Sequence, residues 1–331
     1  MNHKISYYHV ALFLVTLPFD RFYSQLILVS LLLHTIIHFT KETLKLVLTR
    51  QNLLLSLVFL LTVVGTIWSN DKEEGLKDIQ KQLAILLFPF ILSATGLNLR
   101  LYKKKLLILF GITCTITIIY LYTDAARIIL YHKLPLRSLL SPAFINHNFT
   151  EPIGLHATYL SMYAALSIAS FFYYFSLEKN PKNRFLYSAA MIILFVGLIQ
   201  LASRSVFIAL IVFIPFGFLY FKIKDDGKHR LFIACLVISL LTLLAITSIE
   251  TFRERYIGKL KDDLTYASPE NEIADPRILR WHAALSLVKQ SPLTGYGSGS
   301  EKELLKEKYF ENKLYYSYLK ELNAHNQYLS I

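Results

Sequence analysis

Residues 106–122 read LLILFGITCTITIIYLY, a run of 17 residues without a charged side chain, and the lysines at 103–105 come directly before it. A helix rises ~1.5 Å per residue, so roughly 17 to 25 mostly apolar residues are needed to cross about 30 Å of hydrocarbon. The stretch therefore predicts a membrane-spanning helix with a basic flank.

Similar apolar runs recur along the chain. Of its 331 residues, 54% are hydrophobic, and the mean hydropathy is +0.43, which is more apolar than a soluble protein of this length needs. We predict an all-α, polytopic integral membrane protein. Its expected spans are about 5–19, 22–39, 53–68, 83–97, 106–122, 157–177, 185–202, 205–221 and 231–249.

The basic residues predict how these spans are oriented. The connections 40–52, 98–105, 178–184 and 222–230, together with Lys4, carry 15 Lys and Arg residues, whereas the opposite connections 20–21, 69–82 and 123–156 carry 7. Cytoplasmic loops are enriched in Lys and Arg, so the first set is expected to be cytoplasmic. The formal charge of +12 is explained by these loops, and no basic, aromatic-interleaved surface indicates a nucleic-acid partner.

This topology divides the chain into four regions. Residues 1–156 form an N-terminal transmembrane region with five spans and the extracytoplasmic loop 123–156, and residues 157–249 hold spans six to nine. Residues 250–327 form a large extracytoplasmic loop, because 12 basic and 12 acidic residues over 250–331 leave no run long enough to span. Residues 328–331 look like the start of a further span that is cut off at Ile331.

Two helices are expected in the large loop. Asp275 before Pro276 predicts a helix start, and the helix should run to about Gln290 with Ile278, Trp281, Leu285 and Val288 on its apolar face. Residues 291–299, which include three glycines, predict a flexible turn. Ser300 and Glu303 have the spacing of a capping box, so 301–322 should form a second, amphipathic helix.

Ser203 and Arg204 interrupt nearly continuous apolar sequence between two predicted spans. One interpretation is a short hairpin whose arginine reaches the membrane interface. The alternative is that Arg204 faces an internal cavity and holds an anion, because a guanidinium is always charged and binds phosphate with two donors.

Arg277 falls in the first turn of the helix that is expected to start at Asp275, and Arg280 lies one turn further on. Free amides and the helix dipole favour an anion at such a position. The alternative is that both arginines are solvated on a surface helix. Trp281 would then be a packing residue or an interfacial anchor.

His325 lies where the loop returns to the membrane, followed by Asn326. A neutral imidazole, with a reference pKa of about 6.5, could accept a proton from a sugar hydroxyl. The alternative is an ordinary hydrogen-bonded surface histidine. By the predicted topology, Arg204, Arg277 and His325 all face one extracytoplasmic compartment.

No pattern in the sequence indicates a metal site. Cys114 and Cys235 both lie in apolar runs, and the histidines do not have the spacing of metal ligands.

These motifs, together with residues 291–299 (SPLTGYGSG) and 325–329 (HNQYL), resemble the O-antigen ligase and O-antigen polymerase family of bacterial membrane glycosyltransferases. The resemblance covers about 157–331. It implies a GT-C-like helical enzyme of the inner membrane, active on the periplasmic side, that transfers a glycan from undecaprenyl pyrophosphate without metal or other cofactor and inverts the anomeric configuration. The acceptor would be the lipid A-core in a ligase and another glycan in a polymerase.

Carried over by position, the resemblance implies catalytic roles for Arg204, Arg277 and His325. The expected substrate-binding residues are Ser203, Arg280, Trp281 and Asn326. The main alternative class is a transporter or flippase of the same lipid-linked glycan. Such a protein should show internal duplication or charged residues deep within several spans, and neither is evident.

Overall fold

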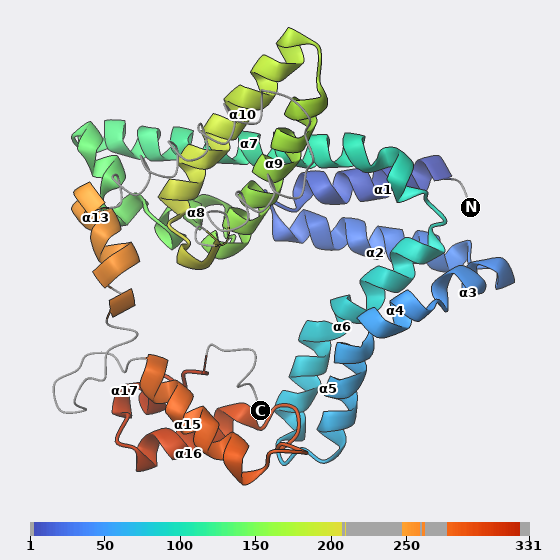
Figure 1. Ribbon diagram of the computed structural model, residues 1–331, viewed down its shortest axis with the longest axis vertical. Helices are drawn as coiled ribbons and strands as arrows, with labels where there is room; N and C mark the ends of the chain where they lie inside the picture. Colours follow the sequence, from blue (N-terminus) through green and yellow to red (C-terminus); the bar gives the residue numbers. More distant parts are fainter. Residues whose placement is uncertain (1–2, 207–208, 210–246, 259, 262–276, 325–331) are drawn as a thin grey trace. The chain divides into compact units, whose positions relative to one another are not determined.

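The computed structural model describes residues 3–206, 209, 247–258, 260–261 and 277–324, and within these ranges all regular structure is helical (Figure 1). This confirms the prediction of an all-α protein for the described residues. The first half of the chain contains α1 (His3–Thr16), α2 (Arg21–Ile37), α3 (Lys41–Val47), α4 (Arg50–Leu55), α5 (Leu57–Ile67), α6 (Lys72–Ala94) and α7 (Leu99–Tyr131). The second half contains η1 (Leu136–Leu140), η2 (Pro142–Phe144), α8 (His147–Thr150), η3 (Glu151–Ile153), α9 (Ala157–Leu177), α10 (Pro181–Leu201), α13 (Glu250–Arg253), η4 (Glu254–Gly258), α15 (Arg277–Gln290), α16 (Glu301–Glu311) and α17 (Tyr315–Leu319).

The chain forms two compact units. We call the unit made of residues 2–34 and 97–257 the long-helix unit, because it contains α7. We call the unit made of residues 35–96 and the chain from 258 onward the glycine-loop unit, after the turn at 295–299.

Three described helices, α7, α9 and α10, are long and apolar enough to cross a membrane. Helix α9 coincides with the predicted span 157–177, and α10 begins somewhat before the predicted residue 185. Its start is explained by Asn180, whose side chain accepts a 3.0 Å hydrogen bond from the Lys182 amide, and by Pro181 at the first helical position. The predicted spans 205–221 and 231–249 fall almost wholly outside the described residues.

Other helices depart from the predicted boundaries. Helix α7 extends 106–122 at both ends and has 33 residues. The predicted span 53–68 is divided at Ser56 between α4 and α5, and 83–97 lies in the second half of α6, which already begins at Lys72. Apolar runs therefore located the helices, while their ends are set by polar caps such as Asp71, whose carboxylate accepts from the Glu74 amide at 3.0 Å.

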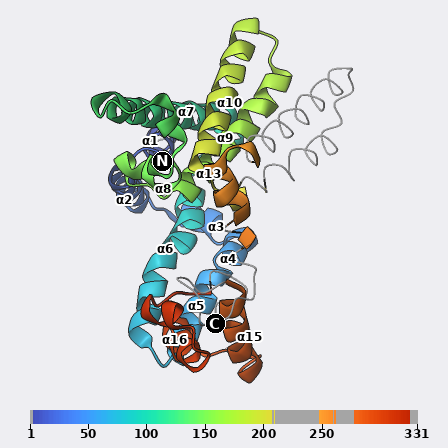
Figure 2. The same ribbon diagram turned by 90° about the vertical axis from the view of Figure 1, so that its left-hand side faces the viewer.

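In the long-helix unit, α9 packs against α7 and α10, and α9 and α10 lie side by side (Figure 1, Figure 2). Glycines allow these contacts to be close. A Cβ added to Gly111 would lie 2.6 Å from Phe171, and one added to Gly197 would lie 2.6 Å from Ile118. Lipid gives little hydrophobic force between helices, so small residues that permit tight packing stabilise the bundle.

In the glycine-loop unit, the turn after α15 packs its backbone directly on α5 and α6. A Cβ added to Gly297 would lie 2.6 Å from the Gly65 carbonyl oxygen, and one added to Gly299 would meet the Gly75 backbone. Both glycines have positive φ, +88° and +91°, which side chains disfavour. The predicted turn is present, and at Gly297 and Gly299 it packs directly on backbone atoms of the neighbouring helices.

Serine hydroxyls join the same turn to α5 and to the connection between α5 and α6. Ser298 donates to the Thr62 carbonyl at 2.9 Å, and the hydroxyls of Ser300 and Ser69 are 3.0 Å apart. Ser300 also donates to the Tyr296 carbonyl and makes no capping bond to α16. The predicted capping box at Ser300 is thus wrong, because the serine bonds to the turn and to the neighbouring hairpin.

The buried face of α15 differs from the predicted one. The structure buries Ala283, Ala284 and Leu287 against α16, whereas Leu285 is 40% exposed. The alanines bury little area themselves, but their size lets the two helices approach closely. Hydrophobicity alone therefore pointed to the wrong stripe of the helix.

The predicted second helix, 301–322, is divided into α16 and α17. Lys313 has φ +59°, its amide donates to the Phe310 carbonyl, and the Leu314 amide donates to the Tyr309 carbonyl at 2.8 Å. This is a Schellman motif, and the burial of Leu314 against Tyr309 stabilises it. Such a left-handed position usually holds glycine or asparagine, so the lysine gave no signal in the sequence.

We expect Gly297→Ala to lower the free energy of unfolding by about 2 kcal/mol or more, because the added methyl group meets backbone atoms at positive φ. Gly295→Ala is the matched control: its φ is also positive, +61°, but the added Cβ meets no heavy atom within 4 Å. It should cost about 1 kcal/mol. Apparent melting temperatures in one detergent compare the variants, and equal shifts would contradict the role of close packing at Gly297.

Candidate functional site

The predicted site residues belong to both units. Ser203 and Arg204 lie in the long-helix unit, Arg277, Arg280 and Trp281 lie in the glycine-loop unit, and His325 and Asn326 lie outside the described residues. The convergence of Arg204, Arg277 and His325 on one pocket stays a prediction. Each unit is described by itself.

Arg204 follows the sharp end of α10. Ala202 has φ +46° and its amide donates to the Ile199 carbonyl, so the chain turns away from the helix axis there. This turn buries Ser203 and leaves Arg204 half-buried at the beginning of the next helical turn. A half-buried guanidinium keeps its charge in a partly desolvated place, where attraction to an anion is stronger than in water.

The loop before α9 is fastened to the same end of α10. The buried side chain of Gln200 donates to the carbonyls of Leu139 at 2.7 Å and Phe144 at 2.5 Å, and the Asn146 amide donates to the Gln200 carbonyl at 3.1 Å. His147 therefore lies at the end of α10 that precedes Arg204.

His147 forms a polar cluster with His156, and neither residue is part of a pattern that predicts a role from the sequence. Their ring centroids are 4.1 Å apart, and His156 caps α9 by accepting from the Thr158 amide at 3.3 Å. Burial lowers the pKa of His147, and the nearby His156 and Arg255 lower it further. A lowered pKa keeps this imidazole neutral at neutral pH, so His147 can donate or accept a hydrogen bond without adding charge.

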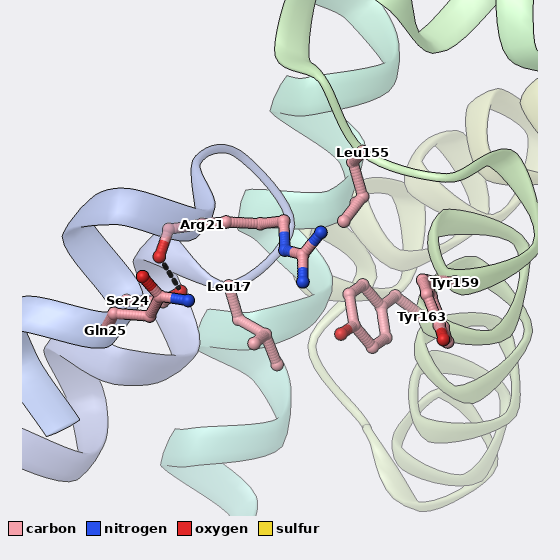
Figure 3. Close-up of a pocket in the computed structure, with 7 residues that line it drawn as sticks. All are labelled: Leu17, Arg21, Ser24, Gln25, Leu155, Tyr159 and Tyr163. Atoms are coloured by element: carbon pink, nitrogen blue, oxygen red, sulfur yellow. Dashed lines mark hydrogen bonds between the residues drawn. The ribbon is translucent and has the colours of Figure 1, made fainter. Parts of the chain in front are cut away.

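A pocket of about 240 Å³ opens beside the first turn of α9 and contains none of the predicted site residues (Figure 3). The side chain of Arg21, from the start of α2, extends into it toward Leu155 and Tyr163. Its other lining residues are Leu17, Ser24, Gln25 and Tyr159. The pocket can hold a polar group between one cation and two phenols.

In the glycine-loop unit, α15 and α16 hold the chain that leads to His325. Arg280 donates through Nη1 to the Asn323 carbonyl at 3.2 Å, and the Trp281 indole donates to the Ala324 carbonyl at 2.9 Å. The Ala324 amide donates to the Glu301 carboxylate at 3.4 Å. We call these three bonds the 323–324 clamp.

The clamp gives Arg280 and Trp281 a function that the sequence did not predict. Arg280 is only 5% exposed, and Ala324 is fully buried. Both α15 side chains bind the two backbone carbonyls directly before His325 in the sequence, so they hold the segment that ends at Ala324. Their expected binding of substrate stays a prediction.

Arg277 is the first described residue of α15 and is half-buried. The first amides of a helix have no partner within it, and the helix dipole is positive at this end. With the helix start predicted at Asp275, the guanidinium of Arg277 in the first turn makes a place suited to an anion.

Comparison with known proteins gives one match. Residues 189–331 match the model of a family described as O-antigen ligase. No curated protein and no solved structure matches the chain. The matched region includes every predicted site residue.

We expect Gln200→Leu to lower the free energy of unfolding by about 2 kcal/mol or more, because two buried carbonyls lose their donor. Gln51→Leu, at an exposed position, is the control and should leave stability nearly unchanged. Thermal unfolding of both purified variants measures the difference. A melting temperature of Gln200→Leu equal to wild type would show that the loop before His147 is held by other contacts.

We expect Trp281→Phe to loosen the segment that ends at Ala324, since phenylalanine keeps the ring but removes the indole donor. Deuterium uptake by peptides covering 318–324 should rise, with a stability loss of about 1 kcal/mol. Lys289→Ala, at an exposed position of the same helix, should leave that uptake unchanged. Unchanged uptake in Trp281→Phe would refute the clamp.

Proposed function

The chain belongs, through residues 189–331, to the O-antigen ligase family, and we propose that it transfers a glycan from undecaprenyl pyrophosphate to an acceptor sugar hydroxyl. It is a helical bacterial membrane protein with a function of the O-antigen ligase or polymerase type. We further propose that the acceptor is the lipid A-core, and that the reaction takes place on the periplasmic side of the inner membrane.

The observation that carries the proposal is the position of the three expected catalytic residues within the matched region. Arg204 and Arg277 are both half-buried, and Arg204 lies at the beginning of a helical turn. Attack on the anomeric carbon breaks its bond to the pyrophosphate and leaves negative charge on the lipid carrier. Fixed guanidinium groups stabilise this charge more strongly in the transition state than in the ground state, so they lower the barrier.

His325 is proposed to take the proton of the acceptor hydroxyl while its oxygen attacks. A base of this kind needs to be held within hydrogen-bond reach of the hydroxyl. The 323–324 clamp supports this assignment, because it fixes the backbone immediately before the histidine to two helices. Attack from the face opposite the leaving pyrophosphate inverts the anomeric configuration, and no step of this scheme calls on a metal ion.

Replacing Arg277 or His325 with alanine should eliminate high-molecular-weight surface glycan in a deletion strain that expresses the variant. The expected loss of turnover is about 10²–10³-fold for a guanidinium that stabilises the leaving group. It is about 10²–10⁴-fold for a general base. Glycan is measured on gels of lipopolysaccharide, and immunoblots of membranes show that the variants accumulate.

Arg137→Ala is the matched control, because Arg137 is an exposed arginine on η1 and should leave the glycan unchanged. Normal glycan in both the Arg277 and the His325 variant would refute the assignment. The deletion strain separates ligase from polymerase: long unligated chains on the carrier indicate a ligase, and single repeats attached to the core indicate a polymerase.

A further inference from the structure

A second cavity lies in the glycine-loop unit, beside the chain that leads to His325. Its volume is about 400 Å³, within the range of roughly 300–1,000 Å³ that holds small-molecule ligands. Helix α6 supplies Glu74, Asp78 and Lys81, α16 supplies Glu301 and Lys302, and the remaining wall consists of Gly299, Glu321, Leu322 and Asn323. We call it the α6–α16 cavity.

Five of the charged side chains that line this cavity are held in ion pairs, and the Glu301 carboxylate accepts from the Ala324 amide. Lys81 bonds to Asp78 at 2.8 Å, and Lys302 bonds to Glu321 at 2.7 Å. Just outside the lining, Lys77 pairs with Glu74 and Lys306 pairs with Glu321. Each such carboxylate therefore keeps a preferred position while retaining oxygen lone pairs that can accept further hydrogen bonds.

The pairing also fixes the ionisation of the cavity wall. Hydrogen bonds from Lys302 and Lys306 lower the pKa of Glu321 to about 2. Glu321 thus stays ionised at any physiological pH, and it presents acceptors only. Donors on the same wall come from Lys81, Lys302 and the Asn323 amide.

The charges around the cavity are balanced, so the wall has no excess positive charge to attract an anion. Its four carboxylates are matched by Lys81 and Lys302 in the wall and by Lys77 and Lys306, which pair with Glu74 and Glu321 from just outside it. Within the part of the chain that the structure describes, no group of three or more His, Cys, Asp or Glu side chains is placed to hold a metal ion. A neutral molecule with many hydroxyl groups fits, because each hydroxyl donates to a carboxylate and accepts from an ammonium or amide.

We propose that the α6–α16 cavity binds the acceptor saccharide, and this rests on the proposed transfer function. Asn323 lines the cavity and is also part of the 323–324 clamp. Two residues of chain reach at most about 7 Å, so a saccharide here lies next to the segment that carries His325. The paired charges of the wall offer acceptors and donors to the hydroxyl groups of an acceptor sugar.

The test removes one ion pair of the wall as a unit. The double variant Asp78→Ala/Lys81→Ala deletes both partners, so neither charge is left alone. Lys308→Ala/Glu311→Ala is the matched control, since this pair is also spaced i,i+3 on a helix, at 2.6 Å, and does not line the cavity. Purified wild type and both variants are assayed with lipid-linked glycan as donor and the host's delipidated core oligosaccharide as acceptor.

We expect the Asp78/Lys81 variant to raise the acceptor KM about fivefold to tenfold, as for the loss of one or two hydrogen bonds, while the donor KM and the melting temperature stay unchanged. The control variant should match wild type. An unchanged acceptor KM, or equal increases in both KM values, would overturn the proposal.

Saturation-transfer NMR with the same oligosaccharide separates this proposal from the proposed function. If wild type forms no product but binds the oligosaccharide more tightly than the Asp78/Lys81 variant, the transfer function fails and the cavity assignment holds. If wild type forms product and the variant binds equally well, the cavity assignment fails and the transfer function holds. No binding to wild type would also overturn the cavity assignment.

Discussion

The close approach of two backbones determines the geometry of the glycine-loop unit. Gly297 and Gly299 leave no room for a side chain between the 295–299 turn and the α5–α6 hairpin, and the serines at 298 and 300 add hydrogen bonds across the contact. The turn joins α15 to α16, so fixing it fixes both helices. Arg277, the 323–324 clamp and the α6–α16 cavity all depend on those helices. A loop segment thereby gains the rigidity that a catalytic constellation requires.

The long-helix unit also depends on close packing at glycines and on hydrogen bonds to backbone carbonyls. Helices in lipid are packed by van der Waals contact and by satisfied polar groups, since burial of apolar surface gives little net gain there. Gly111 and Gly197 provide the contact, and Gln200 satisfies two carbonyls of the loop before α8. The end of α10 is consequently an ordered place, and Arg204 follows it directly. Polar residues at membrane depth are expensive, so each needs such a defined role.

The sequence predicted the features that depend on local pattern. Hydropathy predicted α9 over 157–177, because peptide groups without hydrogen-bond partners are costly in hydrocarbon and an apolar run there must be helical. The predicted end of α15 at Gln290 is also confirmed. The sequence did not predict the buried face of α15, where the small size of Ala283 and Ala284 matters more than hydrophobicity. It also did not predict the end of α16, because lysine seldom occupies a left-handed position. The clamp joins residues 43 positions apart, and no local pattern reports such a contact.

The length of α7 determines where its charged residues lie relative to the hydrocarbon layer of the membrane. Thirty-three residues at ~1.5 Å each give a rod of about 50 Å, some 20 Å more than the hydrocarbon layer. From Lys105, about 30 Å along the rod reaches Asp124, so the Asp124–Arg127 ion pair lies at the level where the hydrocarbon layer ends, and only the last turns of α7 extend beyond it. Charged groups therefore border the uncharged run of α7 at both ends, and moving the helix along the membrane normal would bring one of them into hydrocarbon.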